Sequence, residues 1–171
     1  MAHAVVRTDK LWGTDVRAGL VSVEITEENG IDNGCVATLG ALAAKGTNGT
    51  QREVYTIAKP TASDDFDAIV MLATPEVNGN PAEYALDAHY NKKGDIARAY
   101  RLHKGDIFSV TKEALTCADF EAAKAGDVVE LMAGYTLNVV ASATSGSTVI
   151  GKLLDIEIVG GYTFYVIEVT A

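Results

Sequence analysis

Side chains that could do acid–base or metal chemistry are few and scattered in this chain of 171 residues. The histidines are His3, His89 and His103. None lies two or four residues from another, the spacing that lets two histidines on a strand or helix bind one metal ion. No Cys-x-x-Cys pair, G-x-S-x-G motif, Walker loop or dinucleotide fingerprint occurs either. The sequence therefore predicts no metal, no cofactor, no catalytic residue and no enzymatic activity.

Two local groupings can be weighed against that expectation. His103, Asp106 and Ser109 have the residue types of a catalytic triad. A triad is defined by its geometry in the fold, so closeness along the chain is no indication of one. Asp155 and Glu157 lie two residues apart on a predicted strand and share a face, as the carboxylates of a glycosidase could. Acids on any solvated strand face do the same, and this second interpretation is favoured.

The charge balance limits the partners. Asp and Glu total 23 against 14 Lys and Arg, which gives a net charge of −9. Such a chain repels phosphate backbones, so nucleic-acid binding is not expected. The one locally positive stretch contains Arg98, Arg101, His103 and Lys104. It is either a docking face for an acidic partner or the exterior of an ordinary strand.

The N-terminal segment, residues 1–18, shows no hydrophobic period and is predicted to be an extended arm. It contains Leu11 and Trp12, the only tryptophan. A lone tryptophan in a polar segment typically anchors that segment, either on the chain's own core or on a neighbouring subunit. We expect deletion of residues 1–18 to leave the fold intact and to weaken binding to the partner. The residues predicted to contact a partner are Leu11, Trp12, Arg98 and Arg101.

The cysteines and apolar runs bear on where the chain is made. Cys35 and Cys117 each lie near an apolar run, which favours buried free thiols over a disulfide. The opening residues MAHAVVRTDK lack the apolar core of a signal peptide, and the longest apolar runs are too short to cross a membrane. We therefore expect synthesis in a cytoplasm, without general secretion and without a membrane partner.

The clearest structural signal is a β-hairpin over residues 150–169. Leu154, Ile156 and Ile158 alternate with the residues between them, which places successive side chains on opposite faces of a strand. Gly160-Gly161 then separates this run from a second one, and a two-residue hairpin turn needs positive φ.

Three Gly-Asp steps supply further strand starts. Gly94-Asp95, Gly105-Asp106 and Gly126-Asp127 are each followed by a β-branched residue. Gly-Asp suits a turn and the β-branched residue suits the start of a strand. The steps predict strands at 96–102, 107–111 and 128–132.

The remaining pattern predicts strands at 19–25, 52–58, 67–73 and 135–141, with 67–73 buried on both faces. Thr116 and Asp119 resemble a capping box, and they predict a short helix at 117–124 that packs Phe120 against the sheet. Residues 81–90 fit either a short helix or an extended segment. The predicted fold class is mainly β, with one or two short helices. A small antiparallel barrel or sandwich over 93–171 would pack with a β-rich region over 19–92.

Five runs of this sequence resemble the small capsid decoration proteins, also called head auxiliary or cement proteins, of tailed bacteriophages. The runs are WGTDVRAGLVSVEI, AIVMLATPEV, ARAYRLHKGDIFSVT, KAGDVVELMAG and GKLLDIEIVGGYTFYVIEV. The likeness covers roughly residues 12–170, and its motifs are structural and not catalytic.

The resemblance implies a structural virion protein on the outer surface of the phage head. Such a protein contacts the major capsid protein and stabilises the shell against the pressure of packaged DNA. It also implies a homo-oligomer, a dimer or trimer, because capsids offer local symmetry axes. The alternatives are a tail-tube or fibre-base module, or a carbohydrate- or ligand-binding β-barrel. In the last case Tyr135, Tyr162 or Tyr165 would contact the ligand, although packing is the favoured role for these tyrosines.

Overall fold

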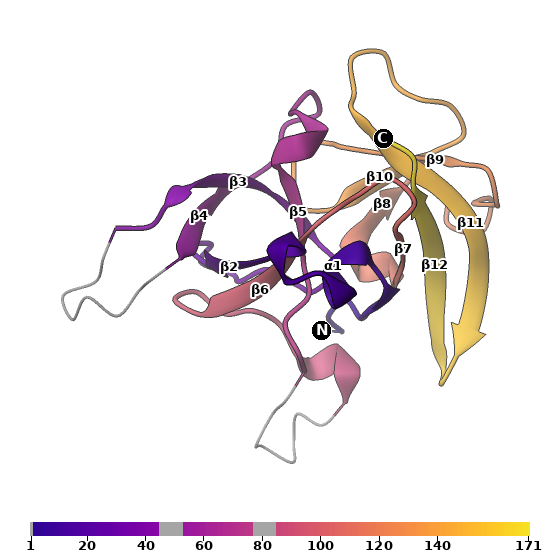
Figure 1. The fold of residues 1–171 in the computed structure, drawn as a ribbon. Coiled ribbons are helices and arrows are strands. Elements are labelled where there is room, and N and C mark those ends of the chain that lie inside the picture. The colour runs from indigo at the N-terminus through magenta and orange to yellow at the C-terminus, as the bar shows by residue number, and fades with distance from the viewer. Residues whose placement is uncertain (1, 45–52, 77–84) are drawn as a thin grey trace.

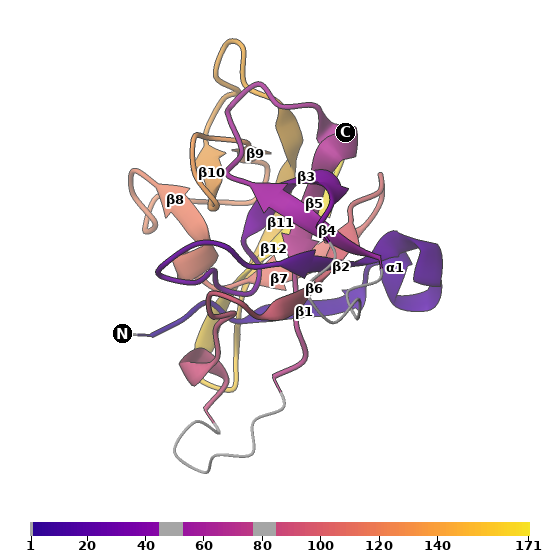
Figure 2. The same ribbon diagram turned by 90° about the vertical axis from the view of Figure 1, so that its left-hand side faces the viewer.

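The computed structural model describes residues 2–44, 53–76 and 85–171. Their strands form a closed five-stranded barrel and a seven-stranded sheet, which lie beside each other (Figure 1). Seen from the barrel end, the barrel strands stand in front of the long sheet strands (Figure 2). The predicted mainly β fold with a few short helices is therefore confirmed. Within the described ranges, no helix has the length and apolar content needed to span a membrane.

The barrel consists of strands from residues 20–101. In barrel order they are β2 (Leu20–Glu24), β4 (Val54–Ala58), β3 (Val36–Leu42), β5 (Ile69–Leu72) and β6 (Ile96–Arg101). The barrel closes because β6 pairs with β2 as well as with β5. The β2–β4 pair is parallel and the other pairs are antiparallel. The strands predicted at 19–25, 52–58 and 67–73 are all present.

The barrel interior is narrow and contains small or β-branched side chains. Val23, Ala97 and Ala99 are at most 1% exposed. Few strands enclose little space, so small residues suit this interior. All four residues of β5 are also buried, as its continuous apolar run predicted. Since successive side chains point to opposite faces, one pair faces into the barrel and the other is covered from outside.

The second layer is an open sheet. Its strand order is β1 (Val6–Lys10), β7 (Ile107–Val110), β12 (Tyr162–Val169), β11 (Val149–Val159), β9 (Val128–Glu130), β10 (Leu137–Val140) and β8 (Leu115–Cys117). Only β8 and β10 pair in parallel. The predicted hairpin is β11–β12, and Gly160 and Gly161 have φ of 62° and 88°. These positive angles are those that a two-residue turn requires.

The position of the barrel differs from the expectation. A barrel or sandwich was predicted within residues 93–171, but that part of the chain forms most of the open sheet, apart from β6, which joins the barrel. The reason is that β6 pairs with strands distant in sequence, for example Ala99 with Val21. Period-two alternation identifies a strand without identifying its partners, so local pattern cannot show which strands close on each other.

The N-terminal segment is part of the fold and not an extended arm. Residues Val6–Lys10 form β1 and pair with β7, while Ala4, Val5 and Leu11 are buried. A short helix, α1 (Trp12–Asp15), and a 3₁₀ helix, η1 (Arg17–Gly19), lead into the barrel. Deleting residues 1–18 would remove an edge strand and several core side chains. From the structure we therefore expect this deletion to destabilise the fold, contrary to the expectation from the sequence.

The helix predicted at 117–124 does not form. Cys117 ends β8, and the chain continues through turns to Gly126. The Asp119 carboxylate accepts a hydrogen bond from the Glu121 backbone N–H (3.0 Å), which is an Asx-type turn and not the start of a helix. Phe120 nevertheless packs against the sheet, with its ring centroid 5.4 Å from that of Tyr165, as expected.

The other described helical turns are single 3₁₀ turns, η2 (Phe66–Ala68), η4 (Leu86–Ala88) and η5 (Lys112–Ala114). The question of helix or extended chain at 81–90 is settled only in part. Residues 81–84 lie outside the described ranges, and the turn at Leu86–Ala88 is helical.

The three Gly-Asp steps share one turn geometry, as predicted. In each turn the aspartate carboxylate accepts a hydrogen bond from the backbone N–H three residues earlier. These bonds join Asp95 to Lys92 (2.8 Å), Asp106 to His103 (2.8 Å) and Asp127 to Lys124 (3.0 Å). The glycine N–H binds another segment, at the carbonyl oxygen of Ile25, Val169 or Leu153. Each Gly-Asp turn thus comes directly before a strand, β6, β7 or β9. The glycine N–H also bonds that turn to a neighbouring segment.

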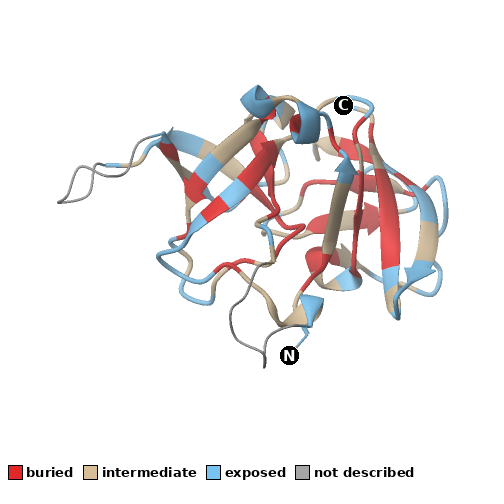
Figure 3. Cartoon of the chain, turned by 60° about the horizontal axis from the view of Figure 1, so that its bottom comes forward, coloured by how far each residue is buried: buried red, intermediate tan, exposed pale blue. Residues whose placement is uncertain are grey.

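The two layers share one hydrophobic core. A single cluster of buried side chains contains barrel residues such as Val70 and Met71 and sheet residues such as Phe108 and Ile167. Buried residues line the strands of both layers, whereas the far end of the β11–β12 hairpin is more exposed (Figure 3). The barrel and the sheet are therefore held together by apolar contact, and the hairpin end extends beyond it.

Candidate functional site

The outer half of β11 is the most exposed apolar part of a regular element. Ile158 is 78% exposed, Val159 47% and Leu154 37%. The strand pairs with β9 only over Val149–Lys152, and the Leu153 N–H donates to the Asp127 carbonyl. From Leu154 onward no described strand pairs with this side of β11. In the sheet β11 lies between β12 and β9, so only its second half is open on one side, and Figure 1 shows this half at the right of the molecule.

The backbone along this margin has groups available for pairing. Val159 and Tyr162 are the pair that closes the hairpin turn. Along an antiparallel pair of strands, residue pairs whose backbone groups bond to each other alternate with pairs whose backbone groups point outward. Ile156 and Ile158 therefore direct their N–H and C=O groups away from β12. The Ile156 N–H is occupied by the Asp155 carboxylate at 2.8 Å. A charged side chain in this position restricts uncontrolled pairing of an open edge.

The inner face of the hairpin is fixed to β1. Arg7 donates to Glu157 (3.1 Å), and its guanidinium carbon lies 5.6 Å from the centroid of the Phe164 ring. Phe164 is buried, with 3% of its surface exposed. The hairpin thus projects from a fixed base.

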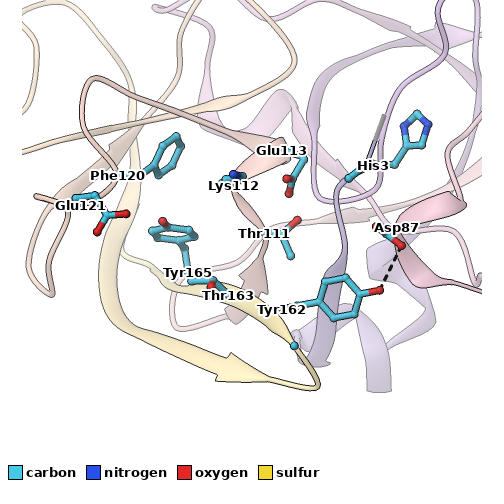
Figure 4. A pocket seen from close by; sticks show the side chains of 12 residues that line it. His3, Asp87, Thr111, Lys112, Glu113, Phe120, Glu121, Tyr162, Thr163 and Tyr165 are labelled. Atoms are coloured by element: carbon cyan, nitrogen blue, oxygen red, sulfur yellow. Dashed lines mark hydrogen bonds between the residues drawn. The ribbon is translucent and has the colours of Figure 1, made fainter.

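A pocket of about 400 Å³ lies at the turn end of the same hairpin (Figure 4). Five segments meet there: the N-terminal residues, η4, η5, the turn after β8, and the hairpin turn. The residues that line it and are labelled in the figure are His3, Asp87, Thr111, Lys112, Glu113, Phe120, Glu121, Tyr162, Thr163 and Tyr165. Only the fold brings these residues together.

Hydrogen bonds fix one side of the pocket. Tyr162 donates its hydroxyl to Asp87 (3.3 Å), and the Asp87 carbonyl accepts from the His3 backbone N–H (2.8 Å). The His3 ring bonds to Asp32 (2.8 Å) and stacks on Tyr90. Partial burial and the Asp87 carboxylate raise the pKa of Tyr162.

The opposite side is acidic and aromatic. Glu113 and Glu121 lie around Tyr165, which is 5% exposed and packs against Phe120. No described residue forms a hydrogen bond with the Tyr165 hydroxyl. Burial first, and then the nearby groups of Cys117, Glu121 and Glu113, raise the pKa of Tyr165.

The predicted partner residues are only partly surface residues. Leu11 is 2% exposed and belongs to the core, so it is not available to a partner. Trp12 is 40% exposed and packs on the His103 ring, with centroids 4.1 Å apart. Its backbone N–H donates to Asp106 at 2.7 Å. Trp12 therefore packs against its own chain, and part of its indole ring stays exposed.

The basic stretch does not form one face. Arg98 lies on the outside of the barrel in a hollow near Thr74 and Pro75. Arg101, with His103 and Lys104, lines a different hollow. An ordinary strand exterior is therefore the better description of Arg98, and Arg101 is separated from it.

The residues that suggested chemistry have structural roles. The Asp106 carboxylate accepts from the backbone N–H groups of Trp12 and His103, and no described hydrogen bond joins it to Ser109. Among described residues there is no cluster of three or more potential metal ligands. Both cysteines are free, and burial raises the pKa of the Cys35 thiol to about 12.

Sequence reasoning missed the pocket but singled out two of its tyrosines. Tyr162 and Tyr165, with Tyr135, were named as ligand contacts only under the ligand-binding alternative, and packing was the favoured role. Nothing in the sequence indicates that Asp87, Glu113 and Glu121 lie near them, because these residues come from three separate turns.

Comparisons with protein-family models, with curated proteins and with solved structures find no match to this chain. The functional argument therefore rests on the surfaces described above and on the resemblance of the sequence runs.

Proposed function

We propose that the protein is a structural virion component that binds the outer surface of a phage head and stabilises its shell. The observation that carries the proposal is the outer half of β11, an open strand margin with an exposed Ile158 on a fixed hairpin. Apolar side chains that are exposed together as one contiguous patch are typical of a protein contact. An open strand margin also provides main-chain groups for a partner strand.

The partner in this proposal is the major capsid protein. The resemblance of the sequence runs supports the choice of a capsid. A shell also presents the same contact many times, so a small surface per copy is sufficient when neighbouring copies support one another. A dimer or trimer on a local symmetry axis would add to that effect.

Co-sedimentation with expanded phage heads that lack the protein tests the proposal. We expect wild-type protein to pellet with heads in a saturable manner. Ile158→Asp should reduce the bound fraction at least tenfold, because it places a charge in an apolar contact. The matched control is Leu42→Asp, which changes a 60% exposed leucine on the barrel. It should bind as wild type does.

Both substitutions lie at exposed positions, so neither should shift the unfolding midpoint. No pelleting of wild-type protein with heads would contradict the capsid assignment. Ordered tubes formed by the protein alone would instead favour a tail-tube module.

A further inference from the structure

The open half of β11 carries different side chains on its two faces. Successive side chains of a strand point to opposite faces. In the regular pairing with β12 that runs from Asp155 to the turn, Ile156 and Ile158 therefore lie on one face, and Asp155 and Glu157 lie on the other. A strand that pairs with this margin is placed beside apolar side chains on one face and beside acidic side chains on the other.

The acidic face has little positive charge to balance it. Residues 153–163 contain no lysine, arginine or histidine. Glu157 is paired with Arg7, whereas no described residue forms a salt bridge with the exposed Asp155. The Asp155 carboxylate bonds to the neutral Ile156 N–H, so its charge is not neutralised. In a chain with a net charge of −9, a basic side chain is the favoured neighbour for this face.

The backbone of the margin can hold a second strand. Ile156 and Ile158 direct their N–H and C=O groups away from β12, and the described hydrogen bonds occupy only the Ile156 N–H. A strand opposite Ile158 can therefore exchange two backbone hydrogen bonds with it, as when a peptide adds to an open sheet edge. Side chains that lie directly across such a pair of strands then contact each other.

A second copy of this chain fits the margin poorly. If two β11 strands pair antiparallel about a two-fold axis at Ile156, Asp155 of each copy faces Glu157 of the other, and an axis at Glu157 places that residue opposite itself. Like charges directly across a pair of strands are destabilising. An axis at Ile158 avoids this conflict, but then each strand contributes only residues 157–159 before the turn. A different, basic segment is therefore the better occupant.

We propose that the margin of β11 binds an extended segment of the protein partner in which apolar residues alternate with lysine or arginine, an inference that rests on the function proposed above. The apolar residues lie beside Ile156 and Ile158, and the basic residues lie beside Asp155 and Glu157. Because opposite charges across two strands stabilise the pair and like charges destabilise it, the margin selects such a segment over an acidic one.

The test is an NMR titration of the full-length, isotope-labelled protein with three peptides. The matching probe is acetyl-Val-Lys-Val-Lys-Val-amide. One control, acetyl-Val-Glu-Val-Glu-Val-amide, reverses the charge, and the other, acetyl-Val-Val-Lys-Lys-Val-amide, keeps the composition but breaks the alternation.

With the matching probe we expect saturable shifts of the Ile156 and Ile158 amides and slower hydrogen exchange of the Ile158 amide. Both controls should bind more weakly, the acidic peptide by about tenfold. Equal binding of all three peptides, or no saturable response to the matching one, would overturn the proposal.

Variants assign the binding to the named groups. Asp155→Asn removes the charge but keeps an oxygen that can accept from the Ile156 N–H. It should weaken the matching probe about two- to fivefold, whereas Asp15→Asn, an exposed acid on α1, should leave it unchanged. Undiminished binding in both Asp155→Asn and Ile158→Asp would show that the peptide binds elsewhere. A wild-type dimer in sedimentation that Ile158→Asp dissociates would show that a second copy occupies the margin. Either result contradicts the proposal.

Competition separates this inference from the capsid assignment. If wild type pellets with heads and a saturating amount of the matching peptide displaces it, while the acidic peptide does not, both proposals are supported. If wild type pellets and the matching peptide displaces none of it, the inference fails and the capsid assignment stands. If the matching peptide binds as expected but wild type does not pellet with heads, the capsid assignment fails while recognition of a basic strand stands.

Discussion

The barrel and the sheet differ in how they treat the unpaired backbone groups at the edges of their strands. Both begin strands with a Gly-Asp turn, at Asp95 in the barrel and at Asp106 and Asp127 in the sheet. The barrel then closes on itself, so it has no outer strand. The sheet stays open, and its β11 extends beyond the strand beside it. Closure removes backbone groups from contact with other proteins, whereas an open sheet leaves a place for them.

The comparison also explains where the candidate site lies. Barrel residues with exposed apolar side chains, such as Leu42 and Ile96, belong to strands that are paired on both sides. At the end of β11, exposed side chains and open backbone occur together. The same hairpin then turns into a pocket with acidic and aromatic walls.

The largest loss of stability should come from shortening a buried side chain of the shared core, in either the sheet or the barrel. Phe108→Ala in the sheet should cost about 3–5 kcal/mol and Met71→Ala in the barrel about 2–5 kcal/mol, since both side chains are at most 1% exposed. Because they belong to one cluster, each should lower a single urea transition seen by Trp12 fluorescence and by circular dichroism. Ile158→Ala, at an exposed position, is the control. Two separate transitions would show that the layers unfold independently.

An intermediate loss of stability should distinguish two of the Gly-Asp turns, those at Asp106 and Asp95. Asp106 is 4% exposed and accepts two backbone hydrogen bonds, whereas Asp95 is exposed and accepts one. Asp106→Ala should therefore lower the free energy of unfolding by about 2–3 kcal/mol and Asp95→Ala by about 1 kcal/mol. Urea titration of both variants measures the difference. Equal losses would show that burial and the second hydrogen bond to Trp12 add nothing.

A smaller loss of stability should appear at alkaline pH, and its source is a buried cysteine beside the barrel. Burial, together with the charge of Asp32, raises the pKa of the Cys35 thiol from 9.0 to about 12. Its stabilising contribution is complete below pH 9 and declines as pH rises toward 12, because only the unfolded chain ionises there. At pH 10 the loss is about 1.4 kcal/mol. Cys35→Ala should flatten this part of the stability profile more than Cys117→Ala does, as measured by urea titration between pH 8 and 10.

The smallest effect should appear at acid pH, where the barrel meets the loop before β11. Hydrogen bonds from the Thr38 and Thr61 side chains lower the pKa of Asp64, while its carbonyl accepts from Thr148. The contribution of this carboxylate is present above its ordinary pKa of 3.8 and is lost as pH falls through the lowered value. Asp64→Asn should therefore make unfolding less dependent on pH below 4. An unchanged acid profile would argue against a role for these contacts.

Local pattern predicted the elements better than their assembly. The Gly160-Gly161 turn, the Gly-Asp turns and the buried β5 were predicted because each depends on residues adjacent in the sequence. The helix at 117–124 was not correct, because Asp119 bonds to Glu121 in a turn and so competes with a helical start. The N-terminal arm was misjudged for a different reason. Its lack of period conceals that β1 finds a partner in β7.

The amino-acid sequence by itself determined a mainly β chain, its turns and its acidic surface, since these follow from neighbouring residues and composition. Only the tertiary structure decided that β6 closes a barrel with β2, that Leu11 is buried, and that the second half of β11 is left open. It also brought Glu113, Glu121 and Tyr165 around one pocket. Strand partners and pocket walls come from distant segments, and their pairing is chosen by the packing of the whole core, which no local pattern records.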